Sequence, residues 1–293
     1  MQVSGFTFVK DAVKYDFPLV ESLNSMLPLC DELFVNVGIS EDETLDIVRS
    51  IKDSKIKIIE TQWDEKFKIK QRILAQQTNI PLYKCSGDWC LYLQADEVLH
   101  EKDYPRIIRC LEDNLDDERV EGILFDFLHF YGSYRTYIRS YHWYRKEIRI
   151  IRNHLGIQSW RDAQGFRVDG KKLNVKECHS DVFHYGWVRD PYKMGQKKKY
   201  QKTLHHGDKA GGSGVEDRFY YEEHIAPYLI GEFDGTHPEV MKDRVSSWKY
   251  DFEPDKFQYK LSPKDKRKRI TDFIDKSTGI KIGEYRNYRL IKD

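Results

Sequence analysis

The first half of the chain alternates short apolar runs with longer segments whose apolar residues recur at helical spacing. The short runs are rich in β-branched and aromatic residues, which is typical of buried strands. The longer segments place their apolar side chains on one face, which is typical of helices that cover a sheet. Strands are therefore predicted at residues 4–9, 32–37, 55–60 and 88–93, and helices at 15–27, 44–52, 67–79 and 104–114. This alternation predicts a largely parallel sheet with helices on both faces.

The second half has a different pattern. Apolar runs predict strands at residues 122–131, 147–152 and 182–185, and a basic helix is expected at 191–206. Glycines in the segment 207–217 indicate a loop. Beyond Tyr220 the pattern predicts short helical pieces, of which the basic run 264–269 forms a solvated helix face. The aromatic residues of this tail are a candidate homodimer surface, with burial in the core as the alternative.

Composition narrows the class of protein. The chain has 293 residues, and 49 Lys and Arg against 48 Asp and Glu give a formal net charge of +1. With 40% hydrophobic residues it is typical of globular proteins rather than disordered or fibrous ones. A near-zero net charge argues against a nucleic-acid partner, which usually requires a basic surface.

Cysteine usage and hydropathy indicate the compartment. The five cysteines include no CxxC pair, which favours a reducing compartment without structural disulfides. The N-terminus lacks the apolar segment of a signal peptide, and no stretch approaches the ~18 apolar residues of a membrane span. We therefore expect a cytoplasmic protein with no transmembrane segment.

Two polar loops follow predicted strands of the parallel part. Residues 38–42 follow the second strand, and the strand at 88–93 leads to the adjacent carboxylates of Asp96 and Glu97. Ligands of such sheets bind beyond the carboxyl ends of the strands, so both loops should converge on one crevice. Carboxylate oxygens suit a hard divalent cation. The alternative is that these acids only favour the start of the next helix.

Several segments resemble the motifs of the family 2 glycosyltransferases, which have the GT-A fold. Residues 36–44 (NVGISEDET) stand in the place of a D-x-G-S-x-D-G-T-like loop, and 70–74 (KQRIL) in that of an A-R-N-x-G-like helix. Residues 87–97 (GDWCLYLQADE) match G-D-W-V-L-x-L-D-A-D-E closely. Residues 149–152 (RIIR) are similar to an R-L-F-R strand, and 184–189 (HYGWVR) to H-Y-G-x-x-R. The resemblance covers the first half well and weakens towards Pro191.

The resemblance implies a fold and its division. The expected class is α/β: a Rossmann-like GT-A domain with a mixed, mainly parallel sheet, helices on both faces and a C-terminal helical extension. Residues 1–120 would form the half that binds the nucleotide sugar, and 121–206 the half that binds the acceptor. Residues 207–293 would form the partly helical extension.

It also implies site residues. Asp96 and a downstream histidine, His184, would hold Mn²⁺ or Mg²⁺. The nucleotide would be bound by a larger set, namely Val9, Asn36, Gly38, Arg72, Gln94 and Ala95. Two of these depart from the family pattern, because Gln94 and Asn36 stand where acids are expected. Both retain hydrogen-bonding capacity, but a neutral Gln94 is a poorer ligand for a hard cation.

Several basic residues have a purely structural or solvent-exposed role as the alternative to ligand binding. Lys70 and Arg72 either bind the nucleotide or lie on a solvated helix face. Arg189 and Lys193 are candidates for the departing diphosphate, whereas the Lys197–Lys198–Lys199 run is expected to be solvated. A zinc site from Cys178, His179 and His184 is disfavoured, because a second cysteine pair is lacking.

A carboxylate must remove the proton of an acceptor hydroxyl. Asp162 is the candidate base, with Asp169 and Glu97 as rivals, and Trp160 is placed to stack on a sugar ring.

The resemblance implies metal-dependent transfer of a sugar from a UDP- or GDP-linked donor to a glycan or another hydroxyl acceptor, and it favours inversion. One alternative is a weakly active or inactive binding protein on the same scaffold. Another is a metal-dependent nucleotidyltransferase or sugar-nucleotide hydrolase. The lack of glycine at residues 9–13 counts against the nucleotidyltransferase.

Overall fold

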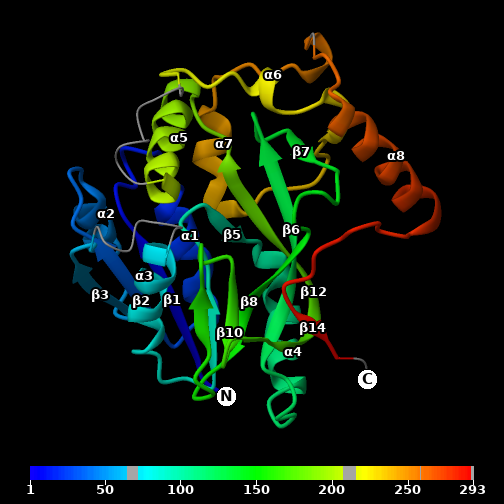
Figure 1. Cartoon of the computed structure of the whole chain (residues 1–293). Coiled ribbons are helices and arrows are strands. Elements are labelled where there is room, and N and C mark those ends of the chain that lie inside the picture. The colour runs from blue at the N-terminus through cyan, green and yellow to red at the C-terminus, as the bar shows by residue number, and fades with distance from the viewer. Residues whose placement is uncertain (65–71, 207–215, 258, 292–293) are drawn as a thin grey trace.

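The computed structural model describes residues 1–64, 72–206, 216–257 and 259–291 (Figure 1). Within these residues one 11-stranded sheet runs through the molecule, with its main path in the order β13-β7-β6-β8-β4-β1-β2-β3. Strands from both halves and from the C-terminal tail join this sheet. The mixed α/β class expected from the sequence is confirmed.

The N-terminal half builds the parallel part of the sheet. Its strands are β1 (Val3–Val9), β2 (Glu32–Gly38), β3 (Ile56–Thr61) and β4 (Trp89–Tyr92), and β1 pairs in parallel with β2 and β4. Its helices are α1 (Leu19–Met26), α2 (Thr44–Ser50), α3 (Arg72–Leu82) and α4 (Tyr104–Asp113). Residues 65–71 lie outside the described residues, so the start of the helix predicted at 67–79 is not tested.

Helices cover both faces of this part, as expected. Side chains of β2 alternate between two buried clusters because successive strand residues point to opposite faces. Leu33 and Val35 pack in the cluster that contains Leu23 of α1. Phe34 packs on the other face in the cluster that contains Leu82 of α3.

Antiparallel strands take over in the second half. The strand β8 (Lys146–Arg152) runs antiparallel to both β4 and β6 (Gly122–Tyr131), while β12 (Asn174–Trp187) is parallel to β6. The sequence missed the short strand β5 (Glu97–Leu99), which pairs antiparallel with β12 and places Glu97 opposite His184. This pairing brings the loop that carries Asp96 against β12.

A small three-stranded sheet lies beside the main one. It comprises β9 (Gln158–Trp160), β10 (Gly165–Val168) and β11 (Lys171–Lys172). The turn between β9 and β10 has positive φ angles at Arg161 (55°) and Ala163 (61°). These backbone angles are uncommon for residues other than glycine, and they occur where a loop is held in a defined shape.

After β12 the chain forms the helix α5 (Pro191–His206). The tail beyond Tyr220 contains α6 (Tyr221–His224), β13 (Ile230–Glu232), α7 (Lys242–Ser247), the longer helix α8 (Pro263–Thr278) and β14 (Arg289–Leu290), and β13 pairs with β7 (Thr136–Ile138). Short 3₁₀ turns occur both in the N-terminal half, as η1 (Leu27–Leu29) and η4 (Glu101–Asp103), and in the tail, as η6 (Pro227–Leu229), η7 (Glu239–Met241) and η8 (Pro254–Lys256). None of the helices in the described ranges has the length and apolar character needed to cross a bilayer.

Aromatic residues of the tail are largely core. Tyr221 and Phe252 are buried against Tyr131 of β6. The basic run at 264–269 lies on α8, where Lys266 and Arg267 are exposed as expected. After α8 the chain returns to the sheet, since β14 pairs with β12.

Candidate functional site

A cavity of about 330 Å³ lies at the carboxyl ends of β1 and β4, and side chains of α5 line one side of it. Its polar end holds Gln94, Ala95 and Asp96, and Val9 lines it from the end of β1. The structure thus brings together four of the residues that the sequence assigned to one site. The opposite end is aromatic and aliphatic, and its lining residues are Phe8, Trp63, Leu74, Tyr200 and Leu204.

Asp96 is buried and surrounded by positive groups. Its Oδ2 lies 3.0 Å from Nζ of Lys197 and 3.5 Å from a guanidinium nitrogen of Arg189. Its Oδ1 lies 3.9 Å from Nε2 of His184. Burial raises the pKa of the Asp96 carboxyl, but the ammonium of Lys197 and the guanidinium of Arg189 outweigh it and hold the pKa below its ordinary value. Asp96 is therefore ionised at neutral pH.

Lys197 is a site residue that sequence reasoning missed. Its side chain is buried and its ammonium donates to Asp96 and, at 2.9 Å, to the carbonyl of Gly186. Burial and the nearby Arg189 lower the pKa of Lys197 to about 8, with Asp96 opposing. The expectation that this lysine run is solvated is wrong for Lys197. Helical phase carries the missing signal, because Met194, Lys197, Gln201 and Leu204 share one face of α5.

The imidazole of His184 is held in one tautomer by His129. Nε2 of His129 lies 2.6 Å from the carbonyl oxygen of Tyr144, which only accepts hydrogen bonds, so this nitrogen carries the proton. Burial lowers the pKa of His129 to about 4 and lowers that of His184 well below its usual value. Both rings are therefore neutral, and Nδ1 of His184 donates to Nδ1 of His129 at 2.9 Å. Nε2 of His184 is left with a lone pair on the side of Asp96.

This donor set fits a divalent cation with two protein ligands. Nε2 of His184 and Oδ1 of Asp96 are 3.9 Å apart, and two ligands that each lie about 2.1 Å from a shared dication span this distance at an angle of about 135°, between the 90° and 180° of an octahedral site. A neutral imidazole and an ionised carboxylate are both suitable donors. Among the described residues no group of three His, Cys, Asp or Glu side chains is placed to hold a metal. The remaining positions would therefore belong to water or to a ligand.

Gln94 holds the β9–β10 turn. Its amide Nε2 donates to the carbonyl of Ala163 at 3.3 Å, so the side chain that replaces an acid in the family pattern ties this turn to the Asp96 loop. Asp162 and Gln164 of the turn line the cavity at Asp96. Both also line a second cavity on the other side of the turn. Asp162 therefore lies between the two cavities.

Three predicted nucleotide residues do not line the Asp96 cavity. Asn36 is fully buried, because its amide donates to Gln77 and its oxygen accepts from Thr61 at 2.7 Å. Gly38 packs against the indole of Trp63, and a Cβ on it would lie 2.4 Å from Nε1. Arg72 is exposed at the start of α3, and Lys70 lies outside the described residues.

Other candidates have structural roles. Glu97 is fully buried in a two-bond ion pair with Arg149, so it is no free base. Arg189 is buried and donates to the carbonyl of Tyr15 at 2.7 Å in addition to facing Asp96. Asp169 and His179 are exposed and line neither cavity. A zinc site is not formed, because His184 faces Asp96 while His179 is exposed.

Gly186 makes a prediction about the His184–Asp96 pair. A Cβ at this position would lie 2.3 Å from Nε2 of His184 and 3.0 Å from Oδ2 of Asp96. We expect Gly186→Ala to displace the imidazole and to lower the free energy of unfolding by about 1–3 kcal/mol, the usual cost of overpacking. Urea denaturation measures this loss. In the background of His184→Ala the same substitution should cost much less, and equal costs in both backgrounds would show that the clash does not exist.

No protein-family model and no curated protein sequence matches this chain. Solved structures of TarS from S. aureus are similar in part. One covers 69% of this chain and 39% of its own, with 13% identity and a TM-score of 0.42. The complex of TarS 1–349 with UDP-GlcNAc covers 70% of this chain and 66% of its own, with 14% identity and a TM-score of 0.39. The complex of TarS 1–349 with UDP matches with 14% identity and a TM-score of 0.40.

This chain thus spans between 39% and 66% of the TarS chains that it matches. At these identities and TM-scores the matches carry no argument about its activity or its residues. The resemblance to the family 2 glycosyltransferases stays a prediction from the sequence motifs.

Proposed function

We propose that the protein is a glycosyltransferase that moves a sugar from a nucleotide-diphosphate donor to a hydroxyl acceptor. The observation that carries the proposal is the Asp96 cavity, which joins a cationic end at Lys197 to an aromatic end at Trp63. A nucleotide diphosphate complements both ends, because its flat base suits the aromatic end and its negatively charged diphosphate suits the cationic end. UDP and GDP are the proposed nucleotides.

The base would lie at the aromatic end of the cavity. Phe8 and Trp63 are in ring contact there, with centroids 6.0 Å apart, and the ammonium of Lys10 lies 5.6 Å from the Trp63 ring centroid. Nε1 of Trp63 is buried against the backbone of Gly38, so a base in the cavity would contact the face of the indole ring rather than this nitrogen.

The diphosphate would lie at the other end. Breaking the bond between the anomeric carbon and the diphosphate places negative charge on the phosphate oxygens, and the ammonium of Lys197 is on hand to stabilise it. Asp96 and His184 would hold Mn²⁺ or Mg²⁺, and the chemistry that such a cation supplies when bound is neutralisation of the same charge.

The acceptor would approach from the second cavity. Asp162 lines both cavities, so its carboxylate is placed to take the proton of an acceptor hydroxyl as that oxygen attacks the anomeric carbon. Attack from the side opposite the diphosphate inverts the configuration. Holding donor and acceptor in adjacent cavities also lowers the entropic barrier to reaction.

A nucleotide-binding protein without transferase activity is the second candidate. The ion pair between Lys197 and Asp96 favours it, because this pair neutralises the carboxylate without a metal. The two candidates differ in whether a divalent cation strengthens nucleotide binding and whether sugar is transferred.

Thermal denaturation with UDP, GDP and their sugar conjugates, with and without Mn²⁺, tests the proposal. A ligand that binds only the folded state raises the melting temperature by mass action. We expect UDP or GDP to raise it, Mn²⁺ to enlarge the shift, and Asp96→Asn to abolish the enlargement. Asp46→Asn, which changes an exposed acid on α2, is the matched control and should behave as the unchanged protein. Failure of every nucleotide to stabilise the protein would contradict the proposal.

A further inference from the structure

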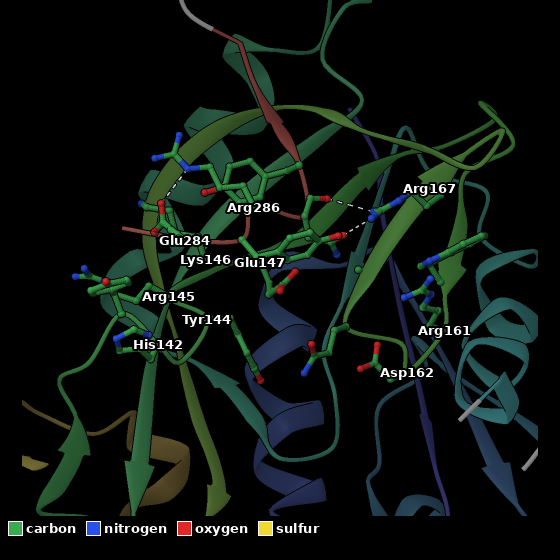
Figure 2. A pocket seen from close by; sticks show the side chains of 18 residues that line it. His142, Tyr144, Arg145, Lys146, Glu147, Arg161, Asp162, Arg167, Glu284 and Arg286 are labelled. Carbon is green, nitrogen blue, oxygen red and sulfur yellow. Dashed lines mark hydrogen bonds and ion pairs between the residues drawn. The ribbon is translucent and has the colours of Figure 1, made fainter. Parts of the chain in front are cut away.

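The second cavity, of about 550 Å³, is formed by three segments that are far apart in the chain (Figure 2). They are residues 141–147, 160–167 and 283–288. The last of them belongs to the C-terminal tail, and Arg167 fixes it by donating to the backbone oxygen of Asn287 at 3.2 Å. The cavity adjoins the Asp96 cavity at Asp162 and Gln164, which line both.

Glu147 of β8 is the unusual residue of this cavity. Figure 2 shows it in the middle of the lining, with Glu284 and Arg286 on one side and Arg161 and Asp162 on the other. Its side chain is 5% exposed, and its Oε2 has no hydrogen-bond partner among the described residues. A buried carboxyl oxygen without a partner is costly unless a ligand supplies the missing donor.

Groups from several elements set the charge of Glu147. Burial raises the pKa of its carboxyl to about 7, Arg149 and the nearby side-chain amide of Asn287 oppose the rise, and Glu97 and Asp162 add to it. Tyr144 and Tyr288, which also line the cavity, interact electrostatically with this carboxyl. The carboxyl therefore changes charge near neutral pH, and its ionised form accepts hydrogen bonds at both oxygens.

Most of the cations that line the cavity are already paired with carboxylates. Arg145 pairs with Asp275 at 2.7 Å, Lys146 pairs with Asp126 at 2.6 Å, and Arg286 contacts Glu284 at 2.9 Å. A cavity with paired cations and a buried carboxyl does not suit a second diphosphate. It suits a neutral ligand that is rich in hydroxyl donors.

Two exposed aromatic side chains also line the cavity. Trp160 is 41% exposed and Tyr285 is 75% exposed. Large aromatic faces left open to solvent beside a polar cavity can pack against the C–H face of a sugar ring while the polar groups bind its hydroxyls. The cavity thus offers both kinds of contact that a sugar makes.

We propose that this cavity binds a neutral sugar unit of the acceptor, with the Glu147 carboxylate accepting hydrogen bonds from its hydroxyls and Trp160 and Tyr285 packing on its faces. The assignment of this sugar as the acceptor rests on the proposed function. Glu147 binds and orients the acceptor, and Asp162, at the border with the Asp96 cavity, remains the group that takes the proton.

The test measures binding of a panel of methyl glycosides by saturation-transfer NMR, between pH 6 and pH 8. The ionised fraction of a carboxyl with a pKa of about 7 rises roughly tenfold over this range, so the affinity of at least one glycoside should rise by up to about tenfold. Glu147→Gln should weaken binding at pH 8 and remove the pH dependence. Trp160→Ala, a change on the surface, should weaken binding and keep the pH dependence.

Several outcomes overturn the proposal. These are a panel in which no glycoside binds the unchanged protein, and a Glu147→Gln protein that binds with unchanged affinity and pH dependence. UDP binding is measured on the same samples. Glycoside binding without UDP binding would support the sugar site and contradict the proposed transferase. UDP binding without glycoside binding would contradict the sugar site and leave the nucleotide-binding part of the proposed function standing.

Discussion

Replacing Arg149 with methionine is expected to lower the free energy of unfolding by about 3–5 kcal/mol, because it leaves a buried carboxylate without its partner. The guanidinium binds both oxygens of Glu97 at 2.6 and 2.7 Å, and both side chains are fully buried. Arg149 also donates to the carbonyl of Gln164 at 3.1 Å. The residue therefore joins the Asp96 loop to the β9–β10 turn, and its loss should also reduce nucleotide binding.

Chemical denaturation of Arg149→Met beside Arg49→Met measures the effect of burial. Arg49 and Glu60 are 2.7 Å apart but about half exposed, so this control should lose no more than about 1 kcal/mol. Adding Glu97→Gln to Arg149→Met should recover part of the loss, since the orphaned charge is then removed. Equal losses at positions 49 and 149 would show that the buried pair is not what holds these loops together.

The parallel half of the fold was predictable because its signals are local. Each of its strands is a short apolar run, and each helix has its own apolar face, as in α1, where Leu19, Leu23 and Met26 are buried. The short strands β5, β7, β9–β11, β13 and β14 were missed, because two to four residues carry almost no periodic signal. Their pairing depends on partners far along the chain, such as that of β14 with β12.

The candidate site was predictable only in part. Asp96 and His184 were placed together from motif resemblance, and the structure brings them within 3.9 Å of each other. Asn36 was assigned to the nucleotide, but whether a polar strand residue faces a ligand or a buried partner depends on tertiary contacts, here with Gln77. Glu147 was missed because a charged residue at a strand end usually indicates solvent.

Replacing Lys197 with methionine is expected to weaken UDP binding in the absence of divalent cations by about 10–100-fold. A buried hydrogen bond to a charged group contributes roughly 1.5–3 kcal/mol, which corresponds to that range. The ammonium is the group that balances Asp96 at 3.0 Å and faces the Asp96 cavity. Without it, the carboxylate and the diphosphate repel each other. Titration calorimetry with UDP, without and with Mn²⁺, measures both the loss and its recovery.

Recovery by Mn²⁺ is the informative part of this experiment. Methionine removes the nearer of the two cations beside Oδ2 of Asp96 and leaves Arg189 at 3.5 Å, so Mn²⁺ should restore more affinity in the variant than it adds to the unchanged protein. Lys199→Met is the control, because Lys199 lies on the same helix but pairs with the exposed Asp217. If Lys197→Met binds UDP as tightly as the control without any cation, Lys197 does not face the diphosphate, and the cationic end of the cavity must be sought elsewhere. If affinity falls and Mn²⁺ restores none of it, Lys197 acts alone and Asp96 only holds it in place.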